Sequence, residues 1–257
     1  MINGMGVHQA TRAANRGRWV VVVARRWKHL VLQHYLQGAD GISFHTHLPR
    51  SDRVYRDANF LLVWGRQTRI PEALLRRHPH LHVVTAEDGF ISTRGLGLTG
   101  SFFYSLLLDR QGIHFDASKP NDLRDLLNNH QFSPADEQLG RELITLIRNN
   151  GLSKCNLREQ GAAQPGIQRG ERPILLAIGQ LENDQALQCS LSPIRTNLQL
   201  LQEIRRQQPE AWVVFKPHPI QLRTGGLGRS LARQYLKYCN QLALEGNITE
   251  WIDAVDA

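Results

Sequence analysis

The stretch NFLLVWGRQTRIPEALLRRHPHLHVVTA, residues 59–86, decides the fold class of this chain. Residues 59–65 form a short apolar run closed by glycine, which is typical of a buried strand. Residues 71–78 begin with proline and end with basic side chains, as helices often do. Residues 80–86 predict a second strand. This order predicts two parallel strands joined by a right-handed crossover, and therefore an α/β fold.

The same pattern recurs later in the chain. Residues 174–179 (ILLAIG) and 211–215 (AWVVF) predict strands, and residues 193–208 predict an amphipathic helix between them. This is a second strand–helix–strand unit. Further helices are expected over residues 119–130, 133–151 and 230–244.

Shifts in composition divide the chain into four parts. Residues 1–18 are polar and unpatterned, so we expect a disordered or non-native start. Residues 19–157 form the first α/β domain, and residues 158–173, rich in Gly, Gln and Pro, form a linker. Residues 174–257 form a second α/β domain with only two clear strands. We therefore expect this domain to be incomplete, as in a fragment or a truncated chain.

Composition and charge limit the molecules that this protein is expected to bind and the compartment in which it is expected to work. The net charge of +8 favours anionic partners such as nucleic acid, nucleotide-linked substrates or an acidic membrane surface, although a basic surface without a role is equally compatible. No nucleic-acid-binding motif accompanies the charge, so no nucleic acid is expected. The apolar run at residues 20–24 is too short to cross a bilayer. Three isolated cysteines fit a reducing compartment, and we expect a cytoplasmic protein.

Charged residues follow each of three predicted strands, where open parallel sheets bind ligands. Glu87 and Asp88 come directly after residues 80–86 and could supply a general base. Taken alone, a turn is the more common meaning of an Asp-Gly pair.

The strand at residues 174–179 is followed by Gln180, Glu182 and Asp184. A carboxylate here could act as a nucleophile or orient a substrate. A helix N-cap and a loop are the alternative interpretation.

Lys216 and His218 follow the strand at residues 211–215, and two prolines bracket the histidine. Both side chains can donate charge-assisted hydrogen bonds to a phosphate, and the prolines would hold them rigid. A proline-rich corner without a ligand is the alternative.

Other motifs carry less weight. Residues 95–100 match a dinucleotide fingerprint in letters but do not follow a strand directly, and residues 225–230 lack the ending of a P-loop. Closely spaced histidines could suggest a metal site, but no carboxylate or cysteine completes the set. These histidines are interpreted as surface or packing residues, and they are His45, His47, His78, His80 and His82.

Five stretches together resemble a known family, the KpsC/LipB-type capsular polysaccharide biosynthesis proteins, over roughly residues 60–257. These stretches are EDGFISTRGLG, SLLLDRQGIHFDASKPNDLRDLL, LSKCNL, GQLENDQAL and VVFKPHP, in this order. The resemblance implies a bacterial, retaining β-Kdo glycosyltransferase that uses CMP-Kdo as its donor. It implies a GT-B-like fold, in which two Rossmann-like domains face a cleft. The N-terminal domain would take the acceptor and the C-terminal domain the nucleotide sugar, with neither metal nor cofactor.

The resemblance also implies roles for residues. Asp184 would be the nucleophile, supported by Gln180 and Glu182 in the same motif. His218 would contact the donor phosphate beside Lys216. Glu87 would be the acid/base on the acceptor hydroxyl, with Asp88 the weaker candidate. A protonated His218 would stabilise the departing phosphate best, so activity is expected to fall as pH rises above its pKa.

The resemblance leaves alternatives open, because the family's TSxxGFEAL stretch is not found in this sequence. The chain could therefore be a truncated, non-catalytic module of capsule biosynthesis or export. It could also be another CMP-sugar-using, sialyltransferase-like GT-B enzyme. The expected partners are a nucleotide-sugar donor and a glycolipid or polysaccharide acceptor. Peripheral contact with the anionic inner-membrane surface is also expected.

Overall fold

The computed structural model describes residues 15–92, 103–154, 166–167, 171–223 and 227–257. Contacts among these residues define two compact units. Unit 1 contains the described residues up to 130, and unit 2 contains those from 131 onward. The predicted linker at 158–173 lies mostly outside the described residues, as do most of the predicted disordered start and the motif at 95–100.

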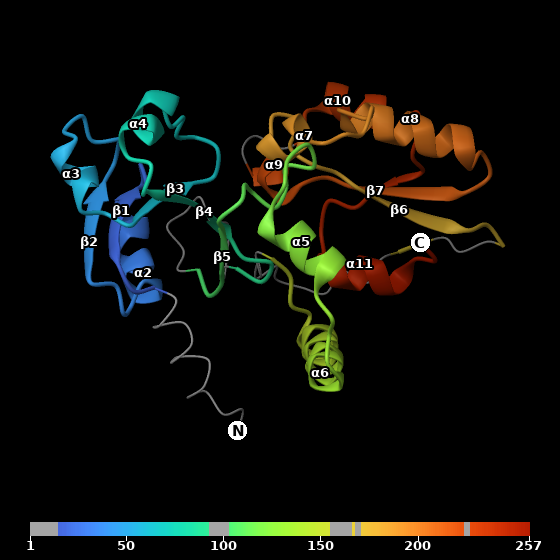
Figure 1. Ribbon diagram of the computed structural model, residues 1–257. Helices are drawn as coiled ribbons and strands as arrows, with labels where there is room; N and C mark the ends of the chain where they lie inside the picture. The colour runs from blue at the N-terminus through green and yellow to red at the C-terminus, as the bar shows by residue number, and fades with distance from the viewer. Residues whose placement is uncertain (1–14, 93–102, 155–165, 168–170, 224–226) are drawn as a thin grey trace. The chain divides into compact units, whose positions relative to one another are not determined.

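Unit 1 is built on one five-stranded sheet (Figure 1). Its strand order is β2-β1-β3-β4-β5, in which the first four are parallel and β5 is antiparallel to β4. The predicted strand–helix–strand unit is confirmed as β3, α4 (Glu72–Arg77) and β4. The strands are β1 (Arg18–Val22), β2 (Gly41–His45), β3 (Phe60–Trp64), β4 (His82–Asp88) and β5 (Leu106–Asp109).

Helices cover both faces of this sheet because successive side chains of each strand point to opposite faces. On one face, Val21 and Leu62 pack with Leu32 of α2 (Trp27–Tyr35). On the other face, Val20 and Leu61 pack with residues of α3 (Arg53–Arg56) and α4. A further helix of unit 1, α5, spans Asp122–Asn129. The two cores explain why the strands read as continuous apolar runs.

The start of unit 1 is ordered earlier than predicted. Strand β1 begins at Arg18, and Asn15 is only 4% exposed. The Asn15 side chain donates a hydrogen bond to the Tyr35 carbonyl at 2.8 Å, and its own carbonyl accepts one from the Trp19 indole at 2.9 Å. The predicted disorder of residues 15–18 is therefore wrong.

Unit 2 contains a parallel sheet of order β6-β7-β8. The two predicted strands are confirmed as β6 (Ile174–Ile178) and β7 (Trp212–Lys216), and β8 (Gln241–Leu242) is a third. The helix predicted at 230–244 is confirmed only in its first part, because α10 (Arg229–Tyr235) ends at Tyr235. Beyond it, the Asn240 amide bonds to the Val213 carbonyl, and pairing with β7 replaces the helix.

The helices of unit 2 have clear sequence signals at their ends. In α6, Ser133 and Asp136 form a capping box and Gly151 ends the helix in the left-handed conformation (φ 56°). Thr196 caps α8, so this helix starts later than predicted. No described helix is long and apolar enough to span a bilayer. The helices are α6 (Pro134–Asn150), α7 (Gln185–Gln188), α8 (Asn197–Gln207), α9 (Pro219–Arg223), α10 (Arg229–Tyr235) and α11 (Ile248–Ala254).

Candidate functional site

In unit 2, two candidate loops leave the same edge of the sheet. Strands β6 and β7 are parallel neighbours, with Ile178 opposite Lys216. The Gly179 amide donates to the Lys216 carbonyl at 2.8 Å, which ties the loop after β6 to the end of β7. A Cβ on Gly179 would lie 2.7 Å from the Phe215 ring, so only glycine fits this approach. The next residues of both loops therefore start close together.

Asp184 lies half-buried at the end of the first loop. Its Oδ1 accepts a hydrogen bond from the Ala186 amide at 2.8 Å, so Asp184 is the N-cap of α7. Burial lowers the pKa of His218, and the Asp184 carboxylate partly offsets this, so the two side chains lie within electrostatic range of each other. The structure thus brings together the two residues that were predicted as nucleophile and phosphate ligand, and it also gives Asp184 the capping role of the alternative interpretation.

His218 is half-buried in the loop after β7. Burial lowers its pKa below the usual value, Asp184 partly offsets this, and Lys154 lowers the pKa further. The Ile220 amide donates to His218 Nδ1 at 3.2 Å, so Nδ1 carries no proton. These contacts favour the neutral imidazole with its hydrogen on Nε2. They argue against the protonated His218 that was expected, which stays a prediction to be tested.

Lys154 is a residue of this site that the sequence reasoning missed. It is exposed, shortly after the C-cap of α6, and its charge acts on His218. The signal was present, because Lys154 belongs to the LSKCNL stretch that carries part of the family resemblance. A flexible ammonium near a neutral imidazole donor is a suitable pair for an anionic group.

Lys216 points to a different place from the one predicted. Its side chain is buried, and Nζ donates to the carbonyls of Gly246 at 2.7 Å and Glu245 at 3.3 Å. Nζ also lies 6.0 Å from the centre of the Trp251 ring in α11. The ammonium therefore holds the turn between β8 and α11, where Gly246 has a φ of 78°.

The predicted supporting residues are joined by a residue that was missed, Asn197. Its side chain accepts from the Gln180 amide and donates to the Gln180 carbonyl, both at 2.9 Å. Its own amide donates to Glu182 Oε1 at 2.9 Å. Asn197 is 4% exposed and is the first residue of α8. The capping sequence Thr-Asn-Leu-Gln at residues 196–199 predicts where α8 starts. It does not predict that Asn197 at this start also bonds to the loop that carries Asp184.

In unit 1, the predicted acid/base pair lies inside a strand. Glu87 and Asp88 are the last residues of β4 and pair with β5, whereas the sequence placed both after the strand. Glu87 Oε1 accepts from the Asp88 amide at 3.0 Å. An Asp88 oxygen lies 3.8 Å from Nζ of Lys28, a second residue that the sequence reasoning missed.

Lys28 is a buried cation in the first turn of α2, with 7% of its surface exposed. Its Nζ lies 3.1 Å from the centre of the Trp64 ring, a cation–π contact. Burial lowers the pKa of Lys28 to about 8, while Asp88 and Glu87 act in the opposite direction. Nothing in the local sequence signals this, because burial of Lys28 depends on Trp64, a residue of β3.

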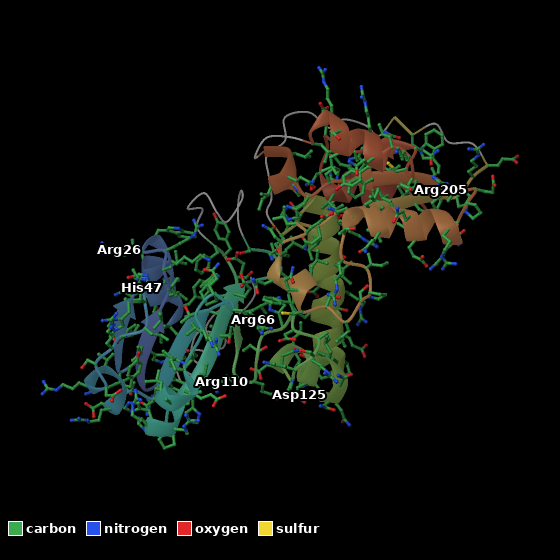
Figure 2. The ribbon with its side chains drawn as sticks, turned by 90° about the horizontal axis from the view of Figure 1, so that it is seen from above. Arg26, His47, Arg66, Arg110, Asp125 and Arg205 are labelled. Carbon is green, nitrogen blue, oxygen red and sulfur yellow. The ribbon has the colours of Figure 1, made fainter. Side chains whose placement is uncertain are left out.

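The loop between β5 and α5 is ordered by two buried aspartates. Asp109 accepts from the amides of Gln111 and Gly112 at 3.0 and 2.7 Å. Asp116 accepts from Arg66 at 2.6 Å, and this arginine is labelled in Figure 2. The hydrogen bond from Ser118 and the charge of Arg66 lower the pKa of Asp116. The GIHFDASKP stretch is therefore a loop held by charged hydrogen bonds.

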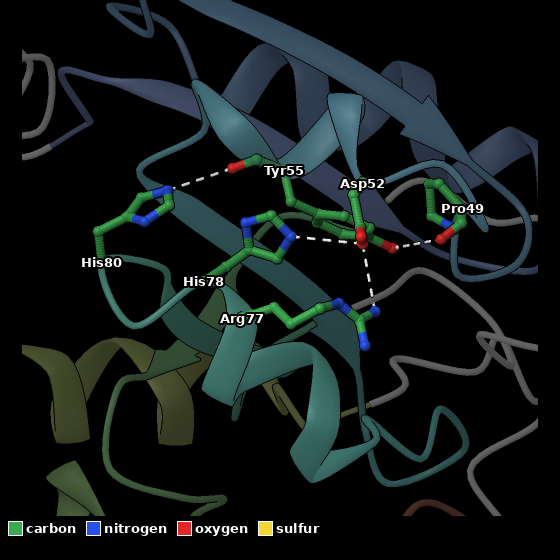
Figure 3. A network of polar contacts seen from close by, with 6 residues as sticks. All are labelled: Pro49, Asp52, Tyr55, Arg77, His78 and His80. Carbon is green, nitrogen blue, oxygen red and sulfur yellow. Dashed lines mark hydrogen bonds and ion pairs between the residues drawn. The ribbon is translucent and has the colours of Figure 1, made fainter.

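Two of the clustered histidines, His78 and His80, contact protein groups (Figure 3). Asp52 accepts from Arg77 at 3.2 Å and lies 3.4 Å from His78, while His80 contacts the Tyr55 carbonyl at 3.2 Å. Among the described residues, no three His, Cys, Asp or Glu side chains gather as a metal site requires. His45 and His47 line a separate hollow of about 400 Å³ beside Arg26.

The sequence is similar to known proteins of capsule and lipopolysaccharide biosynthesis. Residues 138–255 match the family described as "Capsule polysaccharide biosynthesis protein". The chain is 28% identical over 196 residues to the capsule polysaccharide modification protein LipA of Neisseria meningitidis serogroup B, which covers 76% of this chain and 27% of LipA. It is 28% identical over 172 residues to the lipopolysaccharide-processing protein LpsZ of Rhizobium meliloti, covering 66% of this chain and 39% of LpsZ.

Two solved structures share the fold. Both are KpsC proteins of Thermosulfurimonas dismutans, described as a beta Kdo 2,7 transferase and a beta Kdo 2,4 transferase. The first has a TM-score of 0.65 at 24% identity and covers 93% of this chain and 70% of that one. The second has a TM-score of 0.69 at 22% identity and covers 92% and 72%. At these identities the likeness establishes the fold.

Proposed function

We propose that this chain, which matches the capsule polysaccharide biosynthesis family over residues 138–255, serves a glycosyltransferase of the KpsC/LipB type that moves β-Kdo from CMP-Kdo to a glycolipid or polysaccharide acceptor. The chain spans only 27% of LipA and 39% of LpsZ, the curated relatives it matches. The proposal therefore concerns the chemical groups that these residues contribute. Both units would belong to a GT-B-like enzyme with the donor on unit 2 and the acceptor on unit 1.

One observation carries the proposal. Asp184 and His218 follow adjacent parallel strands and interact at the carboxyl edge of the β6-β7-β8 sheet. This edge is where open α/β sheets bind nucleotide ligands. A carboxylate beside a neutral N–H donor matches a reaction in which one face of the sugar is attacked while a phosphate departs from it.

The reaction we propose has two displacements. A carboxylate oxygen of Asp184 attacks the anomeric carbon, the bond to the phosphate oxygen breaks, and CMP leaves with the electron pair. Oδ2 is suited to this attack because Oδ1 caps α7. His218 Nε2–H and Lys154 would stabilise the negative charge that develops on the phosphate. Glu87 would then take the proton of the acceptor hydroxyl, whose oxygen displaces Asp184 and restores the configuration.

The binding partners follow from this chemistry. The donor is a nucleotide sugar, and the acceptor is a glycolipid or polysaccharide. No metal or cofactor is needed, since the protein supplies both the nucleophile and the donors to the phosphate. We place the reaction in the cytoplasm, with peripheral contact between the basic chain and the anionic inner-membrane surface.

A covalent-adduct experiment tests the proposal. The full chain is incubated with CMP-Kdo generated in situ and a glycolipid acceptor, and intact mass spectrometry and CMP release are recorded. We expect a Kdo adduct on the wild type that disappears in Asp184→Ala. The matched control is Asp253→Ala, which removes an exposed aspartate from α11 and should retain the adduct.

Two results would contradict the proposal. An adduct that persists in Asp184→Ala would remove the nucleophile from its role. A wild type that releases no CMP would reject catalysis by this chain. Binding of CMP without turnover would instead support the alternative of a non-catalytic capsule module.

A further inference from the structure

The two adjacent carboxylates of β4 have different surroundings, and Lys28 is the cause. Burying an ammonium is costly unless another group compensates its charge. The Trp64 ring, 3.1 Å from Nζ, provides one compensation, and the Asp88 carboxylate, 3.8 Å from Nζ, provides the other. Both partners come from strands next to each other in the sheet, so the position of Lys28 is fixed by the fold of unit 1.

Strand geometry separates Asp88 from Glu87. Side chains alternate between the two faces of a strand, so Asp88 shares its face with Ala86 and Val84. These two residues pack in the core that includes α2, the helix that carries Lys28. Glu87 is directed to the opposite face, and its Oε1 also accepts the Asp88 amide.

We propose that Lys28 is a positioning residue, which holds Asp88 in an ion pair on the α2 side of the sheet and so assigns the acid/base role to Glu87. The inference rests on the proposed transfer reaction and deepens it by distinguishing two neighbouring carboxylates. Removing the Asp88 carboxylate would leave the buried ammonium without its counter-ion, which is unfavourable. The Asp88 carboxylate thus serves Lys28, and Glu87 is the carboxylate left for the acceptor.

The same contact gives the site a dependence on pH. Burial lowers the pKa of Lys28 to about 8, Asp88 and Glu87 of β4 raise it, and Arg25, just before α2, lowers it. The ammonium therefore loses its proton as pH rises through about 8, and the ion pair with Asp88 is lost. An arginine at this position would stay charged across the same range.

A titration by nuclear magnetic resonance tests the pairing without an activity assay. The chain has five lysines, so the side-chain ¹³Cε signals of labelled lysine are few, and the Lys28 signal is identified by its loss in Lys28→Arg. We expect Asp88→Asn to lower the Lys28 midpoint, and Glu87→Gln to lower it less. A Lys28 midpoint that is the same in wild type and Asp88→Asn would overturn the pairing. The Lys237 signal serves as an exposed control.

The rate of CMP release tests the assignment of roles. Loss of a general acid/base lowers the rate by about 100-fold or more, and we expect this for Glu87→Gln. Asp88→Asn and Lys28→Met should each cost about tenfold in kcat, and the double variant no more than either, because the two residues act as a pair. Lys28→Arg should retain the pair and lose the change in rate near pH 8. The exposed control Lys237→Met should match the wild type.

Different failures point to different causes. A wild type that releases no CMP would reject the proposed function, whereas the lysine titration would still decide whether Lys28 and Asp88 are paired. A loss in Asp88→Asn equal to that in Glu87→Gln, or multiplicative losses in the double variant, would overturn the assignment of Glu87.

Discussion

Each unit buries one lysine, and the two lysines differ in what receives their charge. In unit 1, Lys28 faces the Asp88 carboxylate and lies directly over Trp64. In unit 2, Lys216 donates to two backbone carbonyls and lies farther from the ring of Trp251. Both are less than 10% exposed, so exposure alone does not distinguish them.

The difference shows how one residue type can contact a charged side chain in one place and backbone carbonyls in another. A carboxylate partner can gain or lose a proton, so Lys28 is coupled to the protonation of the candidate site. Carbonyl partners do not titrate, and Lys216 therefore fixes the path of the chain into α11.

Lys216→Met should destabilise unit 2 by about 3 kcal/mol, because it removes the donor to the Gly246 carbonyl beside a buried apolar side chain and leaves the Glu245 carbonyl with the Trp251 indole as its donor. Hydrogen exchange of peptides from β8 and α11 measures the loss within this unit. The matched control Lys237→Met removes an exposed lysine and should change stability by no more than about 0.5 kcal/mol. Equal effects of the two variants would show that Lys216 does not hold the turn.

Lys28 should make the stability of unit 1 rise with pH. The pKa of Lys28 is about 8 in the folded chain, whereas an ordinary lysine, as in the unfolded chain, has a pKa of 10.5. Between pH 8 and 10.5 the unfolded chain therefore binds the proton more tightly than the folded chain. Unfolding free energy then increases as pH rises from 8 to 10.5, by on the order of 3 kcal/mol at most. Urea unfolding of wild type and Lys28→Met at pH 7.5, 9 and 10.5 measures the difference. A gap between them that is constant with pH would contradict the lowered pKa.

Gly179→Ala should cost about 2 kcal/mol, because its Cβ would meet the Phe215 ring and force the loop away from β7. Chemical denaturation measures this cost, and hydrogen exchange of β6 and β7 shows where stability is lost. Gly140→Ala is the control, since nothing lies within 4 Å of its Cβ inside α6, and there alanine should stabilise the helix by about 0.5–1 kcal/mol. A loss of stability in both variants would contradict the close approach at Gly179.

His218→Ala should lower the rate of CMP release about tenfold, equivalent to about 1.4 kcal/mol, as expected for one neutral hydrogen bond. Because its pKa lies below the usual value, wild-type activity should stay level between pH 6.5 and 7.5 and decline only under more acidic conditions. Steady-state kinetics across this range provide the measurement. A decline from pH 6.5 to 7.5 that is absent in His218→Gln would restore the protonated form as the active one.

The sequence predicted strands β3, β4, β6 and β7, and the position of Asp184 and His218 at one sheet edge, for a physical reason. Buried parallel strands are short apolar runs, and the residues after them must lie at one edge, so Asp184 and His218 could be placed together. The direction of a long side chain is not determined locally. Lys216 turns inward because Glu245 and Gly246 lie beside it, and these residues are distant in sequence.

The candidate residues of unit 1 were harder to predict. The position of Glu87 and Asp88 within a strand depends on pairing with β5, and β5 has no strand-like alternation of its own. The burial of Lys28 requires helix α2 to pack over Trp64, which no local pattern indicates. Tertiary contacts, rather than propensity, decide both features.

The loop between β5 and α5 has a consequence for local unfolding. Asp109 and Asp116 hold it through hydrogen bonds from backbone and side-chain donors. The Asp116 pKa is lowered in the folded chain, so its contribution is present above the ordinary value and is lost as pH falls below it. In acid, this segment should become a site of early proteolytic cleavage while the apolar sheet beside it stays intact.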